Sequence, residues 1–287
     1  MAKFIMSAFA DEASSNLDEQ ITELKKANVS MIELRGVDGV NCADLTIEDA
    51  KRIKQKLDAN DIHLSALGSP YGKIGIEDSF EEHLEKLKKS LEVCKILECN
   101  KIRMFSFYLP KACNPVDYRD KVLMRLEKML DVAEREGIKL CHENEKGIYG
   151  DTAVRCRELY DYFGGRLGII FDPANYIQCD VDPKEAYALQ KDTITYFHMK
   201  DALKQDGSVV SVGNGDGSVP EILEDVFKSR NDEVILTVEP HLHVFNGLTD
   251  LQSEELQHKE SYPDSKTAFS AACNAVKHVI DFIGAFL

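Results

Sequence analysis

The sequence reads Ile-Lys-Leu-Cys-His-Glu at 138–143, Leu-Gly-Ile-Ile-Phe-Asp at 167–172, Ile-Thr-Tyr-Phe-His at 194–198 and Val-Ile-Leu-Thr-Val-Glu at 234–239. Each run is mostly apolar, as a buried parallel strand is, and each ends in a residue that can bind a metal. In α/β sheets and barrels the ligand site lies beyond the carboxyl ends of the strands. We therefore expect four strand-end side chains to converge on one point: Glu143, Asp172, His198 and Glu239.

Apolar runs alternate with amphipathic stretches along the whole chain. Strands are expected at 3–9, 31–35, 63–69, 101–107, 139–143, 167–172, 194–199 and 234–239. Helices are expected at 14–27, 46–60, 78–97, 115–136, 152–163, 183–190, 219–228 and from about 266 to 286. Prolines at 115, 183 and 220 support three of the helix starts, where a missing N–H costs little. Strict alternation implies parallel strands joined by right-handed crossovers.

Eight such units can close into a barrel or lie in an open, doubly wound sheet. The open sheet usually carries a glycine-rich phosphate loop after its first strand, but this chain has Phe-Ala-Asp-Glu at 9–12. The pattern therefore favours a single (β/α)8 TIM barrel over residues 1–287, with its active site at the C-terminal ends of the strands. A long irregular segment at about 241–265 is expected over or beside that face, as a lid, a substrate-site wall, a surface excursion or a subunit contact.

Composition narrows the classes of partner and compartment. Hydrophobic residues make up 44% of the 287 residues and charged residues 30%, which is typical of a globular protein with a sizeable core. A formal net charge of −15 disfavours nucleic acid, and no segment is long and apolar enough to span a membrane. Eight scattered cysteines without a CxxC motif, and acidic residues directly after the short apolar start, favour reduced thiols in a cytoplasmic protein.

The predicted convergence of Glu143, Asp172, His198 and Glu239 has a chemical consequence. Taken singly, each is an ordinary strand-end residue. Together, three buried carboxylates would repel one another strongly unless a cation lay between them. A mixed oxygen and imidazole set suits one divalent metal ion.

Several motifs then resemble the sugar phosphate isomerase/epimerase family of the xylose isomerase-like barrel superfamily. The resemblance covers nearly the whole chain, in order, and it rests on Ile-Glu-Leu-Arg (32–35), Gly-Ser-Pro-Tyr-Gly (68–72), Cys-His-Glu-Asn (141–144), Phe-Asp-Pro-Ala-Asn (171–175), Phe-His-Met-Lys-Asp (197–201) and Val-Glu-Pro (238–240). The superfamily also includes ketose 3-epimerases, inosose dehydratases, hydroxypyruvate isomerases and endonuclease IV. None of these motifs specifies a substrate.

The resemblance implies that Glu143, Asp172, His198 and Glu239 hold one divalent ion, which is Mn, Mg, Co or Zn in epimerase-like members. It also implies that Glu143 and Glu239 act as a catalytic acid/base pair on a sugar carbon, while the metal polarises the adjacent oxygens. That chemistry is physically consistent, because a C–H next to a carbonyl becomes more acidic when a cation holds the developing enediolate oxygen.

Substrate contacts are expected at the same mouth of the barrel. Ser69 and His241 follow strand ends, and Asn175 stands where many epimerase-like members have a histidine. Lys204 is the nearest basic residue to the place of an arginine in the family pattern, although the two side chains bind oxygen differently. Weaker expectations place Glu33 and Arg35 near sugar hydroxyls, with an ion pair of Arg35 to Glu33 or Asp38 as the alternative. Second-shell hydrogen bonds to His198 are expected from two residues that follow it: Lys200 and Asp201.

The sequence favours a metal-dependent isomerase or epimerase of a small sugar or polyol. An inosose dehydratase-like lyase acting on a ketopolyol is the nearest alternative, and a non-catalytic carbohydrate-binding barrel is another. An endonuclease IV-like role needs more histidine ligands and a basic face than this acidic chain supplies. Substrate phosphorylation, the physiological metal and the oligomeric state, including a homo-oligomer, stay open.

Overall fold

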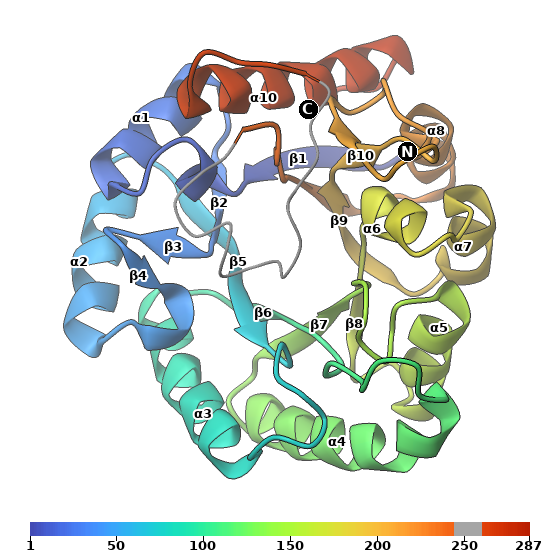
Figure 1. The fold of residues 1–287 in the computed structure, drawn as a ribbon. Helices are drawn as coiled ribbons and strands as arrows, with labels where there is room; N and C mark the ends of the chain where they lie inside the picture. The colour runs from blue at the N-terminus through green and yellow to red at the C-terminus, as the bar shows by residue number, and fades with distance from the viewer. Residues whose placement is uncertain (244–259) are drawn as a thin grey trace.

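The computed structural model describes residues 1–243 and 260–287. Eight parallel strands close into a barrel in the order β1-β12-β9-β8-β7-β6-β5-β2, and helices surround them (Figure 1). The predicted (β/α)8 barrel is therefore confirmed. The barrel strands are β1 (Lys3–Ala8), β2 (Met31–Leu34), β5 (His63–Tyr71), β6 (Lys101–Met104), β7 (Lys139–Glu143), β8 (Gly168–Phe171), β9 (Ile194–Met199) and β12 (Glu233–Val238).

All eight predicted helices are present, with ends that differ by a few residues. Polar side chains set several starts: Asn16, Thr46 and Asp182 each accept a hydrogen bond from a backbone N–H of the first turn. The eight helices are α1 (Leu17–Lys26), α2 (Ile47–Asp58), α3 (Glu81–Ile96), α4 (Arg119–Arg135), α5 (Ala153–Tyr162), α7 (Pro183–Gln190), α8 (Val219–Ser229) and α10 (Ser265–Phe282).

Short elements that the sequence pattern did not predict follow the carboxyl ends of three barrel strands. Helix α6 (Pro173–Gln178) follows β8, and Asp172 is its N-cap rather than the last strand residue. The hairpin β3 (Gly36–Val37) with β4 (Val40–Asn41) follows β2, and the hairpin β10 (Asp201–Ala202) with β11 (Val209–Val210) follows β9. Two-residue strands carry no usable periodicity, so the pattern could not reveal them. Most of the predicted 241–265 loop lies outside the described residues.

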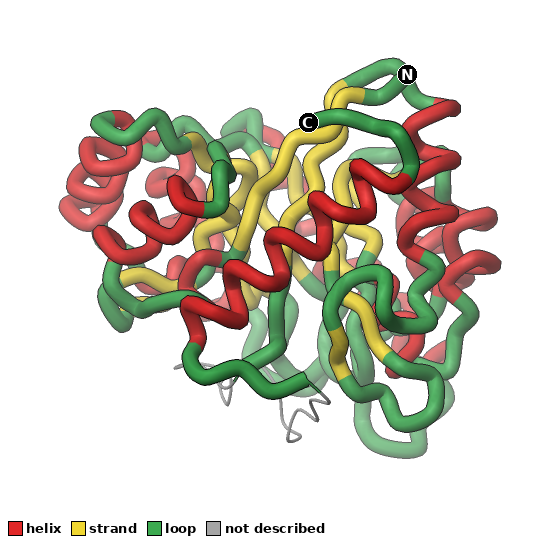
Figure 2. Tube along the Cα trace, turned by 90° about the horizontal axis from the view of Figure 1, so that it is seen from above, coloured by secondary structure: helices red, strands yellow, loops and turns green. Residues whose placement is uncertain are grey.

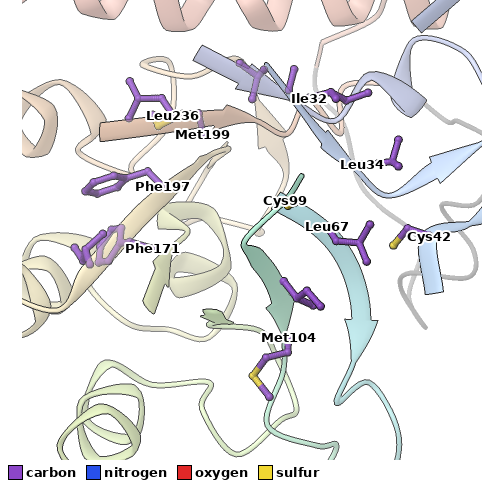
Figure 3. Packing of buried hydrophobic residues seen from close by; sticks show 14 of the residues in the cluster. Ile32, Leu34, Cys42, Leu67, Cys99, Met104, Phe171, Phe197, Met199 and Leu236 are labelled. Carbon is purple, nitrogen blue, oxygen red and sulfur yellow. The ribbon is translucent and has the colours of Figure 1, made fainter. Parts of the chain in front are cut away.

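Side chains alternate between the two faces of each barrel strand. Phe171, Phe197 and Leu236 belong to the large apolar layer between the strands and the helices (Figure 3). Their neighbours Ile170, Tyr196 and Ile235 form a separate small cluster with Ala66 and Cys141, which fills the barrel interior. Residues two positions further along these strands therefore point inward at the carboxyl-terminal mouth.

A view from the side shows that the two ends of the barrel differ. The N-terminus lies at one end, and the β10–β11 hairpin lies at the other (Figure 2). All eight cysteines are free thiols, as expected. Among the described residues, no helix combines the length and the apolar character that a membrane crossing requires.

Candidate metal and catalytic site

The four predicted ligands do come together at the carboxyl-terminal mouth. Glu143, Asp172, His198 and Glu239 are all buried, and each offers a ligand atom within 4.8 Å of those of the other three. The inward alternation explains the convergence, because Glu143, Asp172 and His198 follow the interior residues of their strands by two positions. β7, β8, β9 and β12 are consecutive around the barrel, so the four side chains meet at one place.

The Glu33 carboxylate, on β2, holds the His198 ring in place. His198 Nε2 lies 3.1 Å from Glu33 Oε2, and Nδ1 lies 2.8 Å from Glu143 Oε1. Glu33 is fully buried and also accepts a hydrogen bond from the Tyr196 hydroxyl, at 3.1 Å. Its contacts in this structure are with Tyr196 and His198, and a contact with a sugar hydroxyl stays a prediction. A carboxylate behind an imidazole orients the ring and leaves the other nitrogen for a metal.

His198 is electrostatically coupled to this pair of carboxylates. Burial disfavours its charged form, but the charges and hydrogen bonds of Glu143 and Glu33 outweigh burial and raise the pKa of His198 to about 10. When no metal ion is bound, the imidazole is therefore protonated and lies between the two carboxylates. A metal that displaced this proton would satisfy the same negative charge.

Lys200 lies inside the cluster, closer to the acids than its expected place behind His198. Its Nζ lies 2.9 Å from Asp172 Oδ2 and 2.9 Å from Glu239 Oε2. Burial disfavours its charge, yet the adjacent carboxylates raise the pKa of Lys200 above its usual range. Lys200 therefore contacts two predicted ligands directly, whereas the His198 ring nitrogens face Glu143 and Glu33.

Two buried arginines complete the positive side of the site. Arg103 Nη1 donates to Glu143 Oε2 at 3.2 Å, and its Nη2 donates to the carbonyl oxygen of Gly68 at 2.9 Å. Arg35 pairs with Asp11, Glu12 and Glu239 rather than with Glu33 or Asp38. Both guanidinium groups lie against the ring of Phe9, with centroid distances of 4.5 Å for Arg35 and 5.0 Å for Arg103.

Arg103 was absent from the sequence prediction, although a signal for it exists. It interrupts the apolar run Lys-Ile-Arg-Met at 101–104, and both of its strand neighbours belong to the outer apolar layer. Alternation therefore directs Arg103 into the barrel. The same argument applies to Glu33, whose neighbours Ile32 and Leu34 face the helices.

The charges of the cluster fit a divalent cation. In the described part of the chain, seven carboxylates lie at or beside the cluster, together with four lysine and arginine side chains. The acids are Asp11, Glu12, Glu33, Glu143, Glu145, Asp172 and Glu239, and the cations are Arg35, Lys73, Arg103 and Lys200. Burial, together with the charges of Glu239 and Glu143, outweighs Lys200 and raises the pKa of Asp172 to about 7. Excess negative charge and a mixed carboxylate and imidazole donor set are the conditions in which a metal ion binds.

Two predicted substrate contacts lie behind the acidic cluster. Ser69 is fully buried, and its hydroxyl donates to the carbonyl oxygen of Arg103 at 2.6 Å. The Asn175 amide donates to Glu143 Oε1 at 3.3 Å and to the carbonyl oxygen of Asn144 at 2.9 Å. These contacts make both residues supports of the site in this structure.

His241 lies at the mouth and is fastened by Glu12. The His241 backbone N–H donates to Glu12 Oε2 at 2.6 Å, and His241 Nδ1 lies 3.1 Å from Glu12 Oε1 and 3.7 Å from Glu239 Oε1. Glu12 comes from the 3-10 turn Ala10–Glu12 after β1, so it joins the first barrel unit to the last. Its role was missed because a buried acid in a short turn has no distinctive sequence pattern.

Lys204 and Asp201 are not brought to the ligands. Lys204 Nζ pairs with Asp182 at 2.7 Å, and its side chain is 53% exposed. The Asp201 carboxylate accepts hydrogen bonds from the backbone N–H groups of Ala202, Gly213, Gly215 and Gly217. Asp201 therefore organises the glycine-rich loop, whereas the hydrogen bonds of His198 are with Glu143 and Glu33.

A cavity of about 10 Å³ reaches the cluster, which is space for about one water-sized group. Its lining is strongly polar and consists of Arg35, Lys73, Arg103, Glu143, Glu145, Lys200, Glu239 and His241. Glu143 and Glu239, the predicted acid/base pair, are both at this surface. Asp172 and His198 lie deeper, as residues that only hold a cation would.

The family of the chain follows from a comparison with family models. The model described as xylose isomerase-like TIM barrel matches residues 21–261. The chain therefore belongs to this family, as the resemblance in the motifs implied. A comparison with curated proteins finds no significant match.

Solved structures share the fold at low sequence identity. The IolI protein with a bound zinc atom superposes with a TM-score of 0.75 at 16% identity over 99% of both chains. An L-ribulose 3-epimerase gives 0.74 at 16% identity, over 99% of this chain and 96% of that one. A probable 3-DHS dehydratase, AsbF from Bacillus anthracis, gives 0.73 at 15% identity, over 96% of this chain and 99% of that one.

Proposed function

We propose that the protein is a divalent-metal-dependent isomerase or epimerase of a sugar or polyol, with Glu143 and Glu239 as the proton-transferring pair. The observation that carries the proposal is the convergence of these two carboxylates with Asp172 and His198 within 4.8 Å at the mouth of the barrel. Family membership and the epimerase among the similar folds support it.

Glu143, Asp172, His198 and Glu239 would hold the metal. When bound, a divalent cation supplies a positive charge that polarises the carbonyl and hydroxyl oxygens of a sugar and makes the adjacent C–H more acidic. The deeper pair, Asp172 and His198, would serve only as ligands. Glu33 keeps the His198 ring in the orientation that the ligand set needs.

Glu143 and Glu239 are ionised and therefore able to accept a proton. Burial opposes this, but His198 and Arg103 outweigh it and lower the pKa of Glu143 to about 2. Lys200 and His241 hold the pKa of Glu239 well below its usual range in the same way. Carboxylates with a low pKa are weak bases, so most of the driving force has to come from acidification of the substrate C–H.

The cationic side chains have a separate role in this scheme. Arg103 and Lys200 reach the surface of the small cavity and keep their charge where negative charge would develop on substrate oxygens. Fixed charges in a water-poor site stabilise such oxyanions without reorganisation. A proton that Glu143 or Glu239 returns to the opposite face of the same carbon gives an epimer, and return to the neighbouring carbon gives an isomer.

A lyase is the second candidate, and His241 is the observation that favours it. Elimination of a β-hydroxyl needs a proton donor beside the base that removes the C–H proton. His241 lines the cavity, is held by Glu12 and lies 3.7 Å from Glu239. The dehydratase among the similar folds supports this alternative.

The test is solvent exchange of substrate C–H protons in D2O. Mn2+-loaded wild type is incubated with a panel of ketoses, aldoses and inososes, and NMR and mass spectrometry follow deuterium incorporation and loss of water. Glu239→Gln should lose exchange by a factor of about 100 to 10,000. Glu233→Gln, at the opposite end of β12 and paired with Lys3, is the matched control and should exchange normally.

Bound Mn2+ is measured in every variant, so that loss of a ligand is separated from loss of a base. Wild-type exchange that persists in metal-loaded Glu239→Gln would contradict the acid/base assignment. Loss of water without an isomeric product identifies the lyase. A metal-loaded wild type that exchanges no C–H of any panel member would contradict catalysis and leave a carbohydrate-binding role.

A further inference from the structure

We propose that a second cavity beside the site binds an uncharged, ring-sized group attached to the reacting sugar, so that the substrate is a neutral glycoside or disaccharide rather than a sugar phosphate. The inference rests on the proposed function, because it assumes that a sugar reacts at Glu143 and Glu239. The cavity has a volume of about 480 Å³. It lies among the β3–β4 hairpin, the following turn, the end of β5 and the start of α3 (Figure 1).

The two cavities adjoin each other through shared residues. Arg35 and Lys73 line both the small cavity at the acidic cluster and the larger one. The small cavity, at about 10 Å³, has room for about one water-sized group of a substrate. The remainder of the molecule has to lie outside it, and the larger cavity is the adjoining space in the described part of the chain.

The size of the larger cavity indicates a substrate larger than a single short sugar. Pockets for drug-sized ligands span roughly 300 to 1,000 Å³, and about 480 Å³ falls inside that range. A triose or tetrose would leave much of this volume to water. A reacting sugar that carries a second ring uses the space and buries more surface against the wall.

The charges that line the cavity argue against a phosphate. Each of its cationic side chains already has a carboxylate partner: Lys86 lies 2.6 Å from Asp44, Lys73 lies 2.8 Å from Glu145, and Arg35 lies 2.8 Å from Asp11. A phosphate group would compete with these acids for the cations and would be repelled by the two that belong to the cavity wall, Asp11 and Asp44. Uncharged groups meet no such repulsion.

The remaining wall suits a ring with one apolar face. Val37, Val40, Pro70, Tyr71 and Ile74 contribute apolar surface. Ser15 and Asn41 add hydroxyl and amide groups to the same lining. Sugar and aryl rings both present an apolar face, and a few convergent polar groups fix the orientation of such a ligand.

The test compares four probes by calorimetry on Mn2+-loaded protein: glucose, glucose 6-phosphate, cellobiose and phenyl β-D-glucopyranoside. At least one neutral two-ring probe should bind ten or more times as tightly as glucose, and glucose 6-phosphate should show no gain. A larger gain for glucose 6-phosphate than for both neutral probes, or no gain for either neutral probe, would overturn the proposal.

Two variants locate the effect in this cavity. Ala43→Phe, in the turn Cys42–Asp44, fills the space and should remove the tenfold gain while glucose and Mn2+ bind as before. Val40→Arg, at a position 36% exposed, adds a cation without a partner and should raise affinity for glucose 6-phosphate at least threefold. Val154→Arg on α5, at a position 69% exposed and outside the cavity lining, is the matched control and should change neither affinity.

Thermal unfolding confirms that each variant is folded before binding is measured. A gain that survives in folded Ala43→Phe would overturn the assignment to this cavity. Binding is independent of turnover, so an absence of C–H exchange contradicts the proposed function and leaves the measured probe preference intact. The reverse result, exchange with no preference for a second ring, contradicts only the present inference.

Discussion

Asp172 and Asp201 are both fully buried acids of this barrel, and their surroundings differ. The Asp201 carboxylate accepts four backbone N–H groups of its own loop. The Asp172 carboxylate accepts one backbone N–H, from Asn175 at 2.9 Å, and its other oxygen lies 2.9 Å from Lys200 Nζ, with Glu143 and Glu239 nearby. Backbone amides are permanent partners, whereas a lysine can yield its place to a metal ion. A buried acid whose two oxygens are both satisfied by backbone N–H groups holds its loop in place, whereas one that also faces a lysine and further acids is suited to bind a metal ion.

Metal affinity should show the largest difference between variants of Asp172 and variants of Asp201. Asp172→Asn should lower divalent-metal affinity by a factor of about 1,000, more than the 10- to 100-fold typical of residues behind the ligands. Calorimetry with Mn2+ measures it. Asp201→Asn is the paired variant and should bind Mn2+ within about threefold of wild type, because the Asp201 carboxylate accepts hydrogen bonds from the backbone of its loop. Equal losses of Mn2+ affinity in the two variants would contradict the assignment of Asp172 as a metal ligand and Asp201 as a support of its loop.

The free energy of unfolding should show the opposite order, with the larger loss in the Asp201 variant. Asp201→Ala leaves several backbone N–H groups without an acceptor and should cost about 3 kcal/mol in the free energy of unfolding. Asp172→Asn in metal-free protein removes one of several repelling acids and should cost less than about 1 kcal/mol. Urea unfolding of the metal-free proteins measures both. A larger loss in Asp172→Asn than in Asp201→Ala contradicts the comparison.

Gly215 lies in the loop that donates to the Asp201 carboxylate, and its small size allows the close approach. A Cβ atom there would lie 2.3 Å from Asp201 Oδ1 and 2.6 Å from the carbonyl oxygen of Ala202. Gly215→Ala should therefore cost about 2 kcal/mol of unfolding free energy, by pushing the loop off the carboxylate. Urea unfolding and Mn2+ affinity are measured together, and metal binding should persist. Unchanged stability would show that the loop does not depend on this close approach.

The smallest effect concerns a neutral histidine away from the acids. Burial, with the nearby charges of Arg125 and Lys86, lowers the pKa of His83 to about 4, and His83 Nε2 accepts a hydrogen bond from Gly72 N–H at 2.8 Å. Because the folded pKa is below the unfolded value, His83 contributes stability that is present above about pH 6.5 and is lost as pH falls toward 4.

His83→Asn removes this titration and should reduce the loss of stability between pH 7 and pH 5 by about 1 kcal/mol. Urea unfolding at the two pH values measures the difference. His63→Asn, at an exposed position at the start of β5, is the control and should leave the pH dependence as it is in wild type. If the change in unfolding free energy between pH 7 and pH 5 is the same in wild type, His83→Asn and His63→Asn, the assignment of this pH dependence to His83 is contradicted.

Much of the site could be predicted because its ligands follow local strand signals. Glu143, Asp172, His198 and Glu239 end four apolar runs, and parallel strands bring such ends to one rim. The prediction was weaker where a side chain's role depends on partners that are distant in sequence. Asn175 supports Glu143, and Lys204 pairs with Asp182 at the surface, although both were expected to meet substrate. A contact of Asn175 or Lys204 with the substrate stays a prediction.

The alternation of eight strands and eight helices, and the four ligands at the strand ends, could be read from the sequence because both depend on short-range periodicity. Which charges face one another across the barrel follows from the tertiary fold: Arg103 faces Glu143, Glu33 faces His198, and Lys200 faces Asp172 and Glu239. The tertiary structure also places a larger cavity beside this mouth, and the cationic side chains that line it are held in ion pairs. These features depend on the register of strands far apart in the chain, and periodicity within one strand carries no information about the register between strands.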